Sequence, residues 1–189
     1  MIRRHVYVIG LAAATLCLPT ATAGAQDAGL EAWQKIYSVF SHPRCANCHV
    51  EDERPRWSGA HYGATRVHGM NVQRGPDGFG NAGMRCVTCH QQDNAAQLHG
   101  PPGAHGWHLA PKEMVWWQKS SQEICEQVKD PARNGNRTLE EIATHVRDDG
   151  LVAWGWAPGN GREPAPGSAQ ETYLLLQQWA AAGAPCPAE

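Results

Sequence analysis

Two five-residue stretches carry the side chains best suited to chemistry: Cys45-Ala46-Asn47-Cys48-His49 and Cys86-Val87-Thr88-Cys89-His90. Both read C-x-x-C-H. Two thiols at this spacing can add to the vinyl groups of one haem, and the adjacent histidine then reaches the iron. With 7 Cys and 10 His in 189 residues, random placement would produce about 0.01 such stretches. The sequence therefore predicts two covalently attached haems c, with His49 and His90 as the first iron ligands.

Paired C-x-x-C motifs also occur in four-cysteine zinc sites and in disulfide-exchange proteins. In a zinc site the four motif cysteines would converge on one metal ion. Such a site has no need of a histidine after each second cysteine, whereas this form of haem attachment requires one. Haem is therefore the favoured interpretation, and zinc is its alternative.

The first residues have the pattern of a secretory signal peptide. Two arginines precede an apolar run over residues 6–18, and small residues then permit cleavage after Ala23 or Ala25. The run is too short for a membrane span with such flanks. We therefore expect residues 1–23 to be removed and residues 24–189 to form a single di-haem domain in the periplasm, without stable membrane insertion.

The net charge bears on the partners of this protein, and the remaining cysteines bear on its covalent cross-links. Loss of residues 1–23 removes two arginines and no acidic residue, so the net charge falls from −2 to about −4. A chain this acidic has no reason to bind nucleic acid.

Cys125 and Cys186 remain after haem attachment and the signal segment account for the other cysteines. In an oxidising compartment we expect these two to form a disulfide, and two buried free thiols are the alternative.

The elements that would position the motifs are mostly helical. Residues 27–41 carry apolar side chains at helical spacing, and Pro43 ends the pattern just before the first motif. Residues 50–111 are rich in Gly, Pro, Asn and Asp, so we expect a long loop region there that wraps the haems. The 8 tryptophans are expected to pack against the porphyrins and one another.

Helix signals return in the C-terminal half, where three capping-box patterns mark helix starts. These patterns are Ser120-x-x-Glu123, Thr138-x-x-Glu141 and Ser168-x-x-Glu171. We expect helices near residues 121–129, 139–148 and 169–182, with a Pro/Gly-rich excursion over residues 157–167. The predicted fold class is mainly α: a di-haem cytochrome c-like domain with a Gly/Pro-rich haem-wrapping loop region and a helical C-terminal half.

The second ligand of each iron is less well defined. His68 follows His49 by 19 residues and His108 follows His90 by 18. The two halves of the chain thus match as a motif, a Gly-rich loop and a histidine. We therefore predict His68 opposite His49 and His108 opposite His90. Met70 is the alternative ligand for the first haem and Met114 for the second. The remaining candidates are His42, His61, His99, His105, His145 and Met84.

Several segments spread over the chain resemble a known family. They are His42-Pro43-Arg44-Cys45, Val72-Gln73-Arg74-Gly75-Pro76-Asp77-Gly78, Gly83-Met84-Arg85-Cys86, Trp107-His108-Leu109-Ala110-Pro111, Lys129-Asp130-Pro131-Ala132-Arg133-Asn134-Gly135, Trp154-Gly155-Trp156 and Cys186-Pro187. In these segments the chain is similar to small exported di-haem c-type cytochromes, often labelled as associated with, or subunits of, isoquinoline 1-oxidoreductase-like molybdenum hydroxylases. The resemblance implies an electron carrier that works beside a periplasmic oxidoreductase.

Two functions are compatible with two haems. The first is transfer of single electrons between an oxidoreductase and a downstream acceptor, for which haem iron with both axial positions filled is sufficient. The alternative is a small peroxidase- or oxidase-like enzyme, in which one iron lacks a second protein ligand and binds a small substrate. The chain has ample histidines to fill both positions and no further recognisable catalytic constellation. We therefore expect an electron-transfer protein rather than an enzyme.

Overall fold

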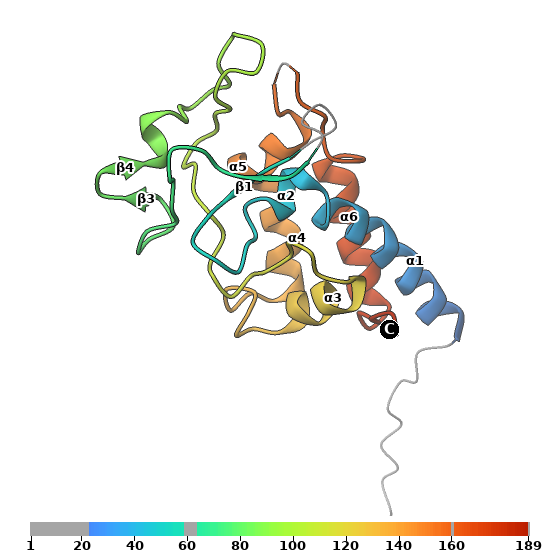
Figure 1. Cartoon of the computed structure of the whole chain (residues 1–189). Helices are drawn as coiled ribbons and strands as arrows, with labels where there is room; N and C mark the ends of the chain where they lie inside the picture. The colour runs from blue at the N-terminus through green and yellow to red at the C-terminus, as the bar shows by residue number, and fades with distance from the viewer. Residues whose placement is uncertain (1–22, 59–63, 160, 189) are drawn as a thin grey trace, which may run out of the picture.

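The computed structural model describes residues 23–58, 64–159 and 161–188. The predicted signal peptide, apart from Ala23, lies outside these residues, and so does the candidate ligand His61. The described chain has two parts, a group of packed helices and a region of loops (Figure 1). The architecture is mainly helical, as predicted.

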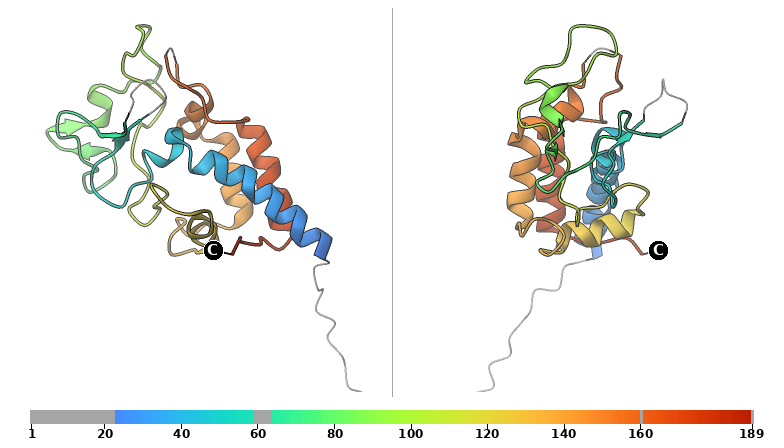
Figure 2. Two further views of the ribbon diagram at one scale, coloured as in Figure 1. Left: turned by 45° about the vertical axis from the view of Figure 1, so that its right-hand side comes forward. Right: turned by 60° about the vertical axis from the view of Figure 1, so that its left-hand side comes forward.

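Four helices form the packed group: α1 (Ala23–Phe40), α3 (Ser121–Lys129), α4 (Leu139–Asp148) and α6 (Ala169–Ala181). Helix α6 packs between α1 and α4, and α3 packs against α1 (Figures 1 and 2). Their shared core is built from large apolar side chains that are fully buried: Trp33, Ile36, Ile124, Leu176 and Trp179. This packing fixes the positions of α1 and α4, which border the candidate site.

The capping patterns explain where these helices begin. Ser120 and Thr138 each accept a hydrogen bond from the backbone three residues later, and Glu123 and Glu141 bond back to the cap residues. Two of the three predicted capping boxes are therefore confirmed. At the start of α6 the Glu171 backbone donates to Ser168 Oγ at 3.1 Å. These local bonds satisfy amide donors that a helix start otherwise leaves unpaired.

The loop region contains little regular structure, as predicted for residues 50–111. Strand β1 (Arg56–Trp57) pairs antiparallel with β2 (Arg66–Val67), and β3 (Gly80–Asn81) pairs antiparallel with β4 (Met84–Arg85). Gly75 and Gly80 have φ of +68° and +92°, and a Cβ at Gly75 would lie 2.4 Å from the Gly80 carbonyl oxygen. Glycine is thus required where the turn approaches β3.

Four short helices complete the chain: α2 (Pro43–Ala46), η2 (Cys86–Thr88), α5 (Gly150–Ala153) and η3 (Trp154–Trp156). Two of them, α2 and η2, carry the first cysteine of each C-x-x-C-H motif. Residues 157–167 form no helix or strand where they are described, which agrees with the predicted excursion. The motifs therefore lie on short turns between longer segments.

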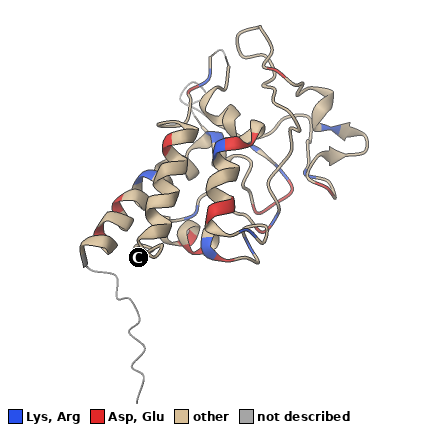
Figure 3. Cartoon of the chain, turned by 180° about the vertical axis from the view of Figure 1, so that it is seen from behind, with Lys and Arg blue, Asp and Glu red and all other residues tan. Residues whose placement is uncertain are grey.

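A disulfide joins Cys125 of α3 to Cys186 in the C-terminal tail, which confirms the predicted pairing. Acidic and basic side chains are interspersed along the helices (Figure 3). None of the helices in the described ranges combines the length and apolar character that a membrane crossing needs.

Candidate functional site

Each C-x-x-C-H motif faces its own predominantly apolar pocket. The first pocket has a cavity of about 250 Å³ and is lined by Cys45, Cys48 and His49, among others. The second has a cavity of about 420 Å³, and its lining includes Cys86, Cys89 and His90. Pockets for small molecules and cofactors have volumes of roughly 300–1,000 Å³, so both cavities approach or reach that range. The structure thus places each motif at a separate cavity.

The first motif is held in place by the end of α1 and by the short helix α2. The Arg44 backbone donates to His42 Nδ1 at 3.2 Å, which caps α2, and Pro43 occupies the first helical turn. The Cys48 backbone then donates to the Cys45 carbonyl at 3.1 Å. This turn places both thiols at the first pocket.

The His49 ring is fixed by a stack of aromatic rings. It lies parallel to Trp116 at a centroid distance of 3.5 Å, and Trp116 stacks on Phe40 at 4.4 Å. Burial lowers the pKa of His49 to about 3, and the Met114 backbone opposes this shift. The imidazole is therefore neutral at physiological pH, which is the form that ligates metals.

One His49 ring nitrogen, Nδ1, is buried without a hydrogen-bond partner in the described chain. The Met114 backbone that influences its pKa lies outside hydrogen-bond geometry for this atom. A buried polar atom without a partner is uncommon and often marks a functional site. His49 is therefore suited to taking part in a further interaction at this pocket.

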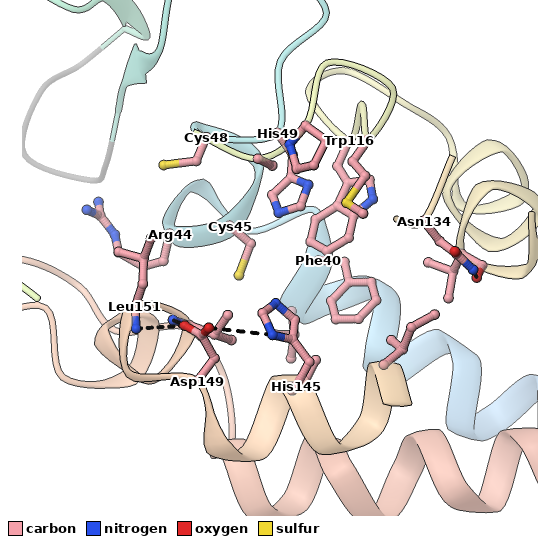
Figure 4. A pocket seen from close by; sticks show the side chains of 18 of the residues that line it. Phe40, Arg44, Cys45, Cys48, His49, Trp116, Asn134, His145, Asp149 and Leu151 are labelled. Carbon is pink, nitrogen blue, oxygen red and sulfur yellow. Dashed lines mark hydrogen bonds and ion pairs between the residues drawn. The ribbon is translucent and has the colours of Figure 1, made fainter. Parts of the chain in front are cut away.

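His145 lies across the first pocket from His49, on α4 (Figure 4). Its Nδ1 is 3.5 Å from Asp149 Oδ2. Burial lowers the pKa of His145, and the nearby Asp149 carboxylate opposes the shift. His145 is one of several candidate histidines in the sequence, and the offset pattern does not single it out. The spacing of four residues to Asp149 on a helix is the sequence signal that could have done so.

The second motif has a corresponding arrangement. His90 Nδ1 lies 2.8 Å from the Pro102 carbonyl oxygen, and the ring stacks on Trp107 at 4.4 Å. Trp107 in turn meets Trp154 edge to face at 4.9 Å. A carbonyl bonded to Nδ1–H fixes the tautomer and leaves Nε2 as the ligating nitrogen. His90 thus has the orientation that haem ligation would require.

His68 lies beside His90 in the second pocket. The two ring centroids are 6.0 Å apart. Two imidazoles that ligate one metal ion from opposite sides have ring centres about 6 Å apart, because each metal–nitrogen bond is about 2 Å and each nitrogen lies about 1 Å from its ring centre. The His68–His90 separation is compatible with two ligands of one iron.

The pairing predicted from sequence offsets differs from this grouping, because His68 does not line the pocket of His49. The reason is the β1–β2 pairing, together with a hydrogen bond from the His68 backbone to the Pro55 carbonyl. These contacts hold His68 near the second motif. His108 lines both pockets, so it shares the second pocket with His90 as predicted and also borders the first.

The other candidate ligands have different surroundings. Met114 is buried and lines the first pocket, whereas Met70 lines the second and is 66% exposed. Met84 and His99 also line the second pocket. His42 caps α2, and His105 is exposed and bonded to Gln92. The assignment of the two thioether alternatives is therefore wrong, because Met114 lies at the pocket of the first motif and Met70 at that of the second. His42 and His105 have other contacts.

The two pockets share part of their lining. The shared residues are Arg44, Cys48, Trp107, His108 and Trp154. The Arg44 guanidinium lies over the Trp154 ring, 5.6 Å from its centroid. Because five residues line both cavities, the groups bound in them would be close neighbours.

Each pocket offers the two thiols of its motif, the motif imidazole stacked on an aromatic ring, and at least one further imidazole. Across the described ranges, no three or more His, Cys, Asp or Glu side chains gather as a metal ion held by side chains alone would need. Haem iron already has four porphyrin nitrogen ligands and needs only two ligands from the protein. The residues present therefore fit haem. Comparisons with models of known families, with curated proteins and with solved structures found no match to this chain.

Proposed function

We propose that this chain is an exported di-haem c-type cytochrome that transfers single electrons between a periplasmic oxidoreductase and a downstream acceptor. The observation that carries the proposal is the division of two C-x-x-C-H motifs between two apolar pockets, each with a further histidine. Haem, when bound, supplies one-electron chemistry at its iron. The cysteines would attach it, with His49 and His90 as axial ligands.

Electron transfer is favoured over the enzyme alternative by the surplus of imidazoles at both cavities. His145 faces the first, His68 faces the second, and His108 borders both. An enzyme that binds peroxide or another small substrate needs one open axial position and a positioned acid or base. Filled axial positions suit a carrier of electrons instead.

The location and partner are proposed on separate grounds. The signal-peptide pattern and the Cys125–Cys186 disulfide support an oxidising compartment such as the periplasm. The resemblance of the quoted segments supports an oxidoreductase partner, with a molybdenum hydroxylase as the specific candidate. The acidic net charge gives no support for a nucleic-acid partner.

The intact mass of the exported protein tests the proposal directly. It should exceed that of the mature polypeptide by two haem masses, and the reduced protein should show the spectrum of thioether-linked haem. Cys48→Ala and Cys89→Ala should each lower the covalent haem content. Thr88→Ala, a change at an exposed position inside the second motif that the pattern leaves free, is the matched control and should keep both haems.

A mass equal to the bare chain, with or without zinc, would refute the haem assignment. Rapid turnover of peroxide by a protein that does carry two haems would instead favour the enzyme alternative. Reversible uptake of two electrons per chain, without substrate turnover, is the expected behaviour.

A further inference from the structure

We infer that His145 is the second axial ligand of the haem at the first motif, opposite His49, and that Asp149 positions it. The inference rests on the proposed function, because it assumes a haem attached at Cys45 and Cys48. It replaces the sequence-based expectation that His68 would occupy this place.

The first pocket presents the two imidazoles from opposite walls. His49 follows α2 on one wall and His145 projects from α4 on the other, with the Cys45 side chain between them (Figure 4). The His49–Trp116–Phe40 stack forms a side wall of the same cavity. A ligand attached to the two thiols would therefore lie between the two imidazoles.

Asp149 can hold the His145 ring in place because each of its two carboxylate oxygens has its own contact. Its Oδ1 accepts from the Leu151 and Val152 backbones at 2.8 and 3.1 Å, which caps α5. Its Oδ2 faces His145 Nδ1, and its backbone donates to the His145 carbonyl at 3.1 Å. Metal-bound histidines usually give their second ring N–H to a carboxylate or carbonyl. This arrangement turns Nε2 of His145 away from Asp149 and leaves it as the ligating atom.

The rival ligands at this pocket are held by other contacts. A Cβ placed on Gly135 would come within 2.9 Å of the Met114 methyl carbon, so the tip of Met114 lies against that turn. The His108 ring stacks on Phe79 at 4.7 Å, and it lines the second pocket as well as the first. His68 lies at the second pocket. The His145 ring lies across the cavity from His49 (Figure 4).

The spin state and carbon monoxide binding of single variants test the inference. His145→Ala should turn one haem high spin and let the reduced protein bind one carbon monoxide per chain, while the unmodified protein binds essentially none. His145→Met should keep that haem low spin and add a far-red methionine-to-iron charge-transfer band, which a purely structural role would not produce. His105→Ala, a change at an exposed histidine outside both pockets, should match the unmodified protein.

A double variant shows which iron is affected. His68→Ala alone should also open one haem, and His145→Ala with His68→Ala should bind two carbon monoxide molecules per chain. If each single variant binds one carbon monoxide molecule and the double variant also binds only one, both histidines serve the same iron, and this would overturn the inference. An unchanged low-spin spectrum in His145→Ala, or no charge-transfer band in His145→Met, would overturn it as well.

The haem content of each variant separates this result from the proposed function. A His145→Ala variant that carries two haems per chain, both of them low spin, would refute the His145 assignment alone. The absence of covalent haem would instead refute the proposed function. Asp149→Asn tests the positioning role, because asparagine can still cap α5 but cannot share the charge. It should raise the reduction potential of one haem and leave the spin state unchanged. Unaltered potentials would show that Asp149 does not act on the ligand.

Discussion

At the scale of single residues, Arg74 connects separate parts of the loop region. It is 6% exposed, and its guanidinium donates to the carbonyls of Val50 and Asp52 at 2.7 and 3.2 Å and to that of Ala110. Burial lowers the pKa of Arg74, while nearby carboxylates, first among them Glu53, oppose the shift. One planar side chain thus joins the segment after the first motif to the segment after His108.

Arg74→Ala should therefore lower the free energy of unfolding by about 3 kcal/mol, because it leaves buried carbonyls without a charged donor. Arg74→Lys should recover little of this loss, since an ammonium cannot reproduce the guanidinium fork. Denaturant unfolding of the haem-loaded protein measures both changes. Arg66→Ala, at an exposed position of β2, is the control and should stay within about 0.5 kcal/mol. Equal losses for Arg66 and Arg74 would contradict this role.

At the scale of elements, the N-cap of α2 depends on protonation. His42 Nδ1 accepts the Arg44 backbone N–H, and a protonated ring cannot accept that bond. Burial is the main cause that lowers the His42 pKa from 6.5, and the Arg44 charge adds to it, while Glu163 opposes the shift. The folded-state pKa is thus below the unfolded value. The contribution of this cap to the free energy of unfolding is complete above pH 6.5, and it is lost as the pH falls below that value.

His42→Asn should remove this dependence, because asparagine is an effective N-cap that does not titrate. The unmodified protein should lose stability relative to the variant as the pH falls below 6.5. Thermal unfolding over a pH series checks the difference. His105→Asn, at an exposed histidine, is the control and should keep the slope of the unmodified protein. A parallel slope in His42→Asn would show that the cap does not titrate in this range.

The elements also show what sequence patterns could predict. The helices expected over residues 121–129 and 139–148 appear with those bounds, because capping bonds are local and can be read from neighbouring residues. The partner of His49 could not be read this way. It depends on how α4 packs against α6 and on the β1–β2 pairing, which separates His68 from the first motif. Equal sequence offsets carry no information on such long-range contacts.

At the scale of the whole molecule, the C-terminal tail is bonded to both α3 and α6. Cys186 is bonded to Cys125, the Lys129 ammonium donates to the Ala184 carbonyl at 2.8 Å, and Trp179 Nε1 donates to the Pro185 carbonyl at 2.9 Å. The disulfide closes a span of 61 residues. It therefore links the helical core to the end of the described chain.

Replacing both Cys125 and Cys186 by alanine should lower the free energy of unfolding by about 4 kcal/mol, because the open chain has more unfolded conformations. Amide hydrogen exchange in α6 should accelerate, while the absorption spectra of the haems stay unchanged. Exchange mass spectrometry with parallel spectroscopy checks both outcomes. A change in the haem spectrum that precedes the faster exchange in α6 would contradict this prediction.

The shared lining of the two pockets gives a second test at this scale. Trp107 lines both cavities and stacks on His90, whereas Trp116 lines the first and stacks on His49. Trp107→Leu should therefore shift the reduction potentials of both haems, and the matched Trp116→Leu should shift one. Redox titration followed by absorbance measures these shifts. A Trp107 variant that alters a single haem would show that the pockets are independent.

The first pocket also imposes an order on maturation. One of its walls comes from residues 39–49, and the opposite wall comes from α4 and α5, about a hundred residues later in synthesis. In the folded chain, burial raises the pKa of Cys45 to about 12 and that of Cys48 to about 11, which disfavours the nucleophilic thiolate form of both side chains. Under the proposed function, attachment of haem at the first motif should therefore be fastest before α4 docks and completes the second wall of the pocket.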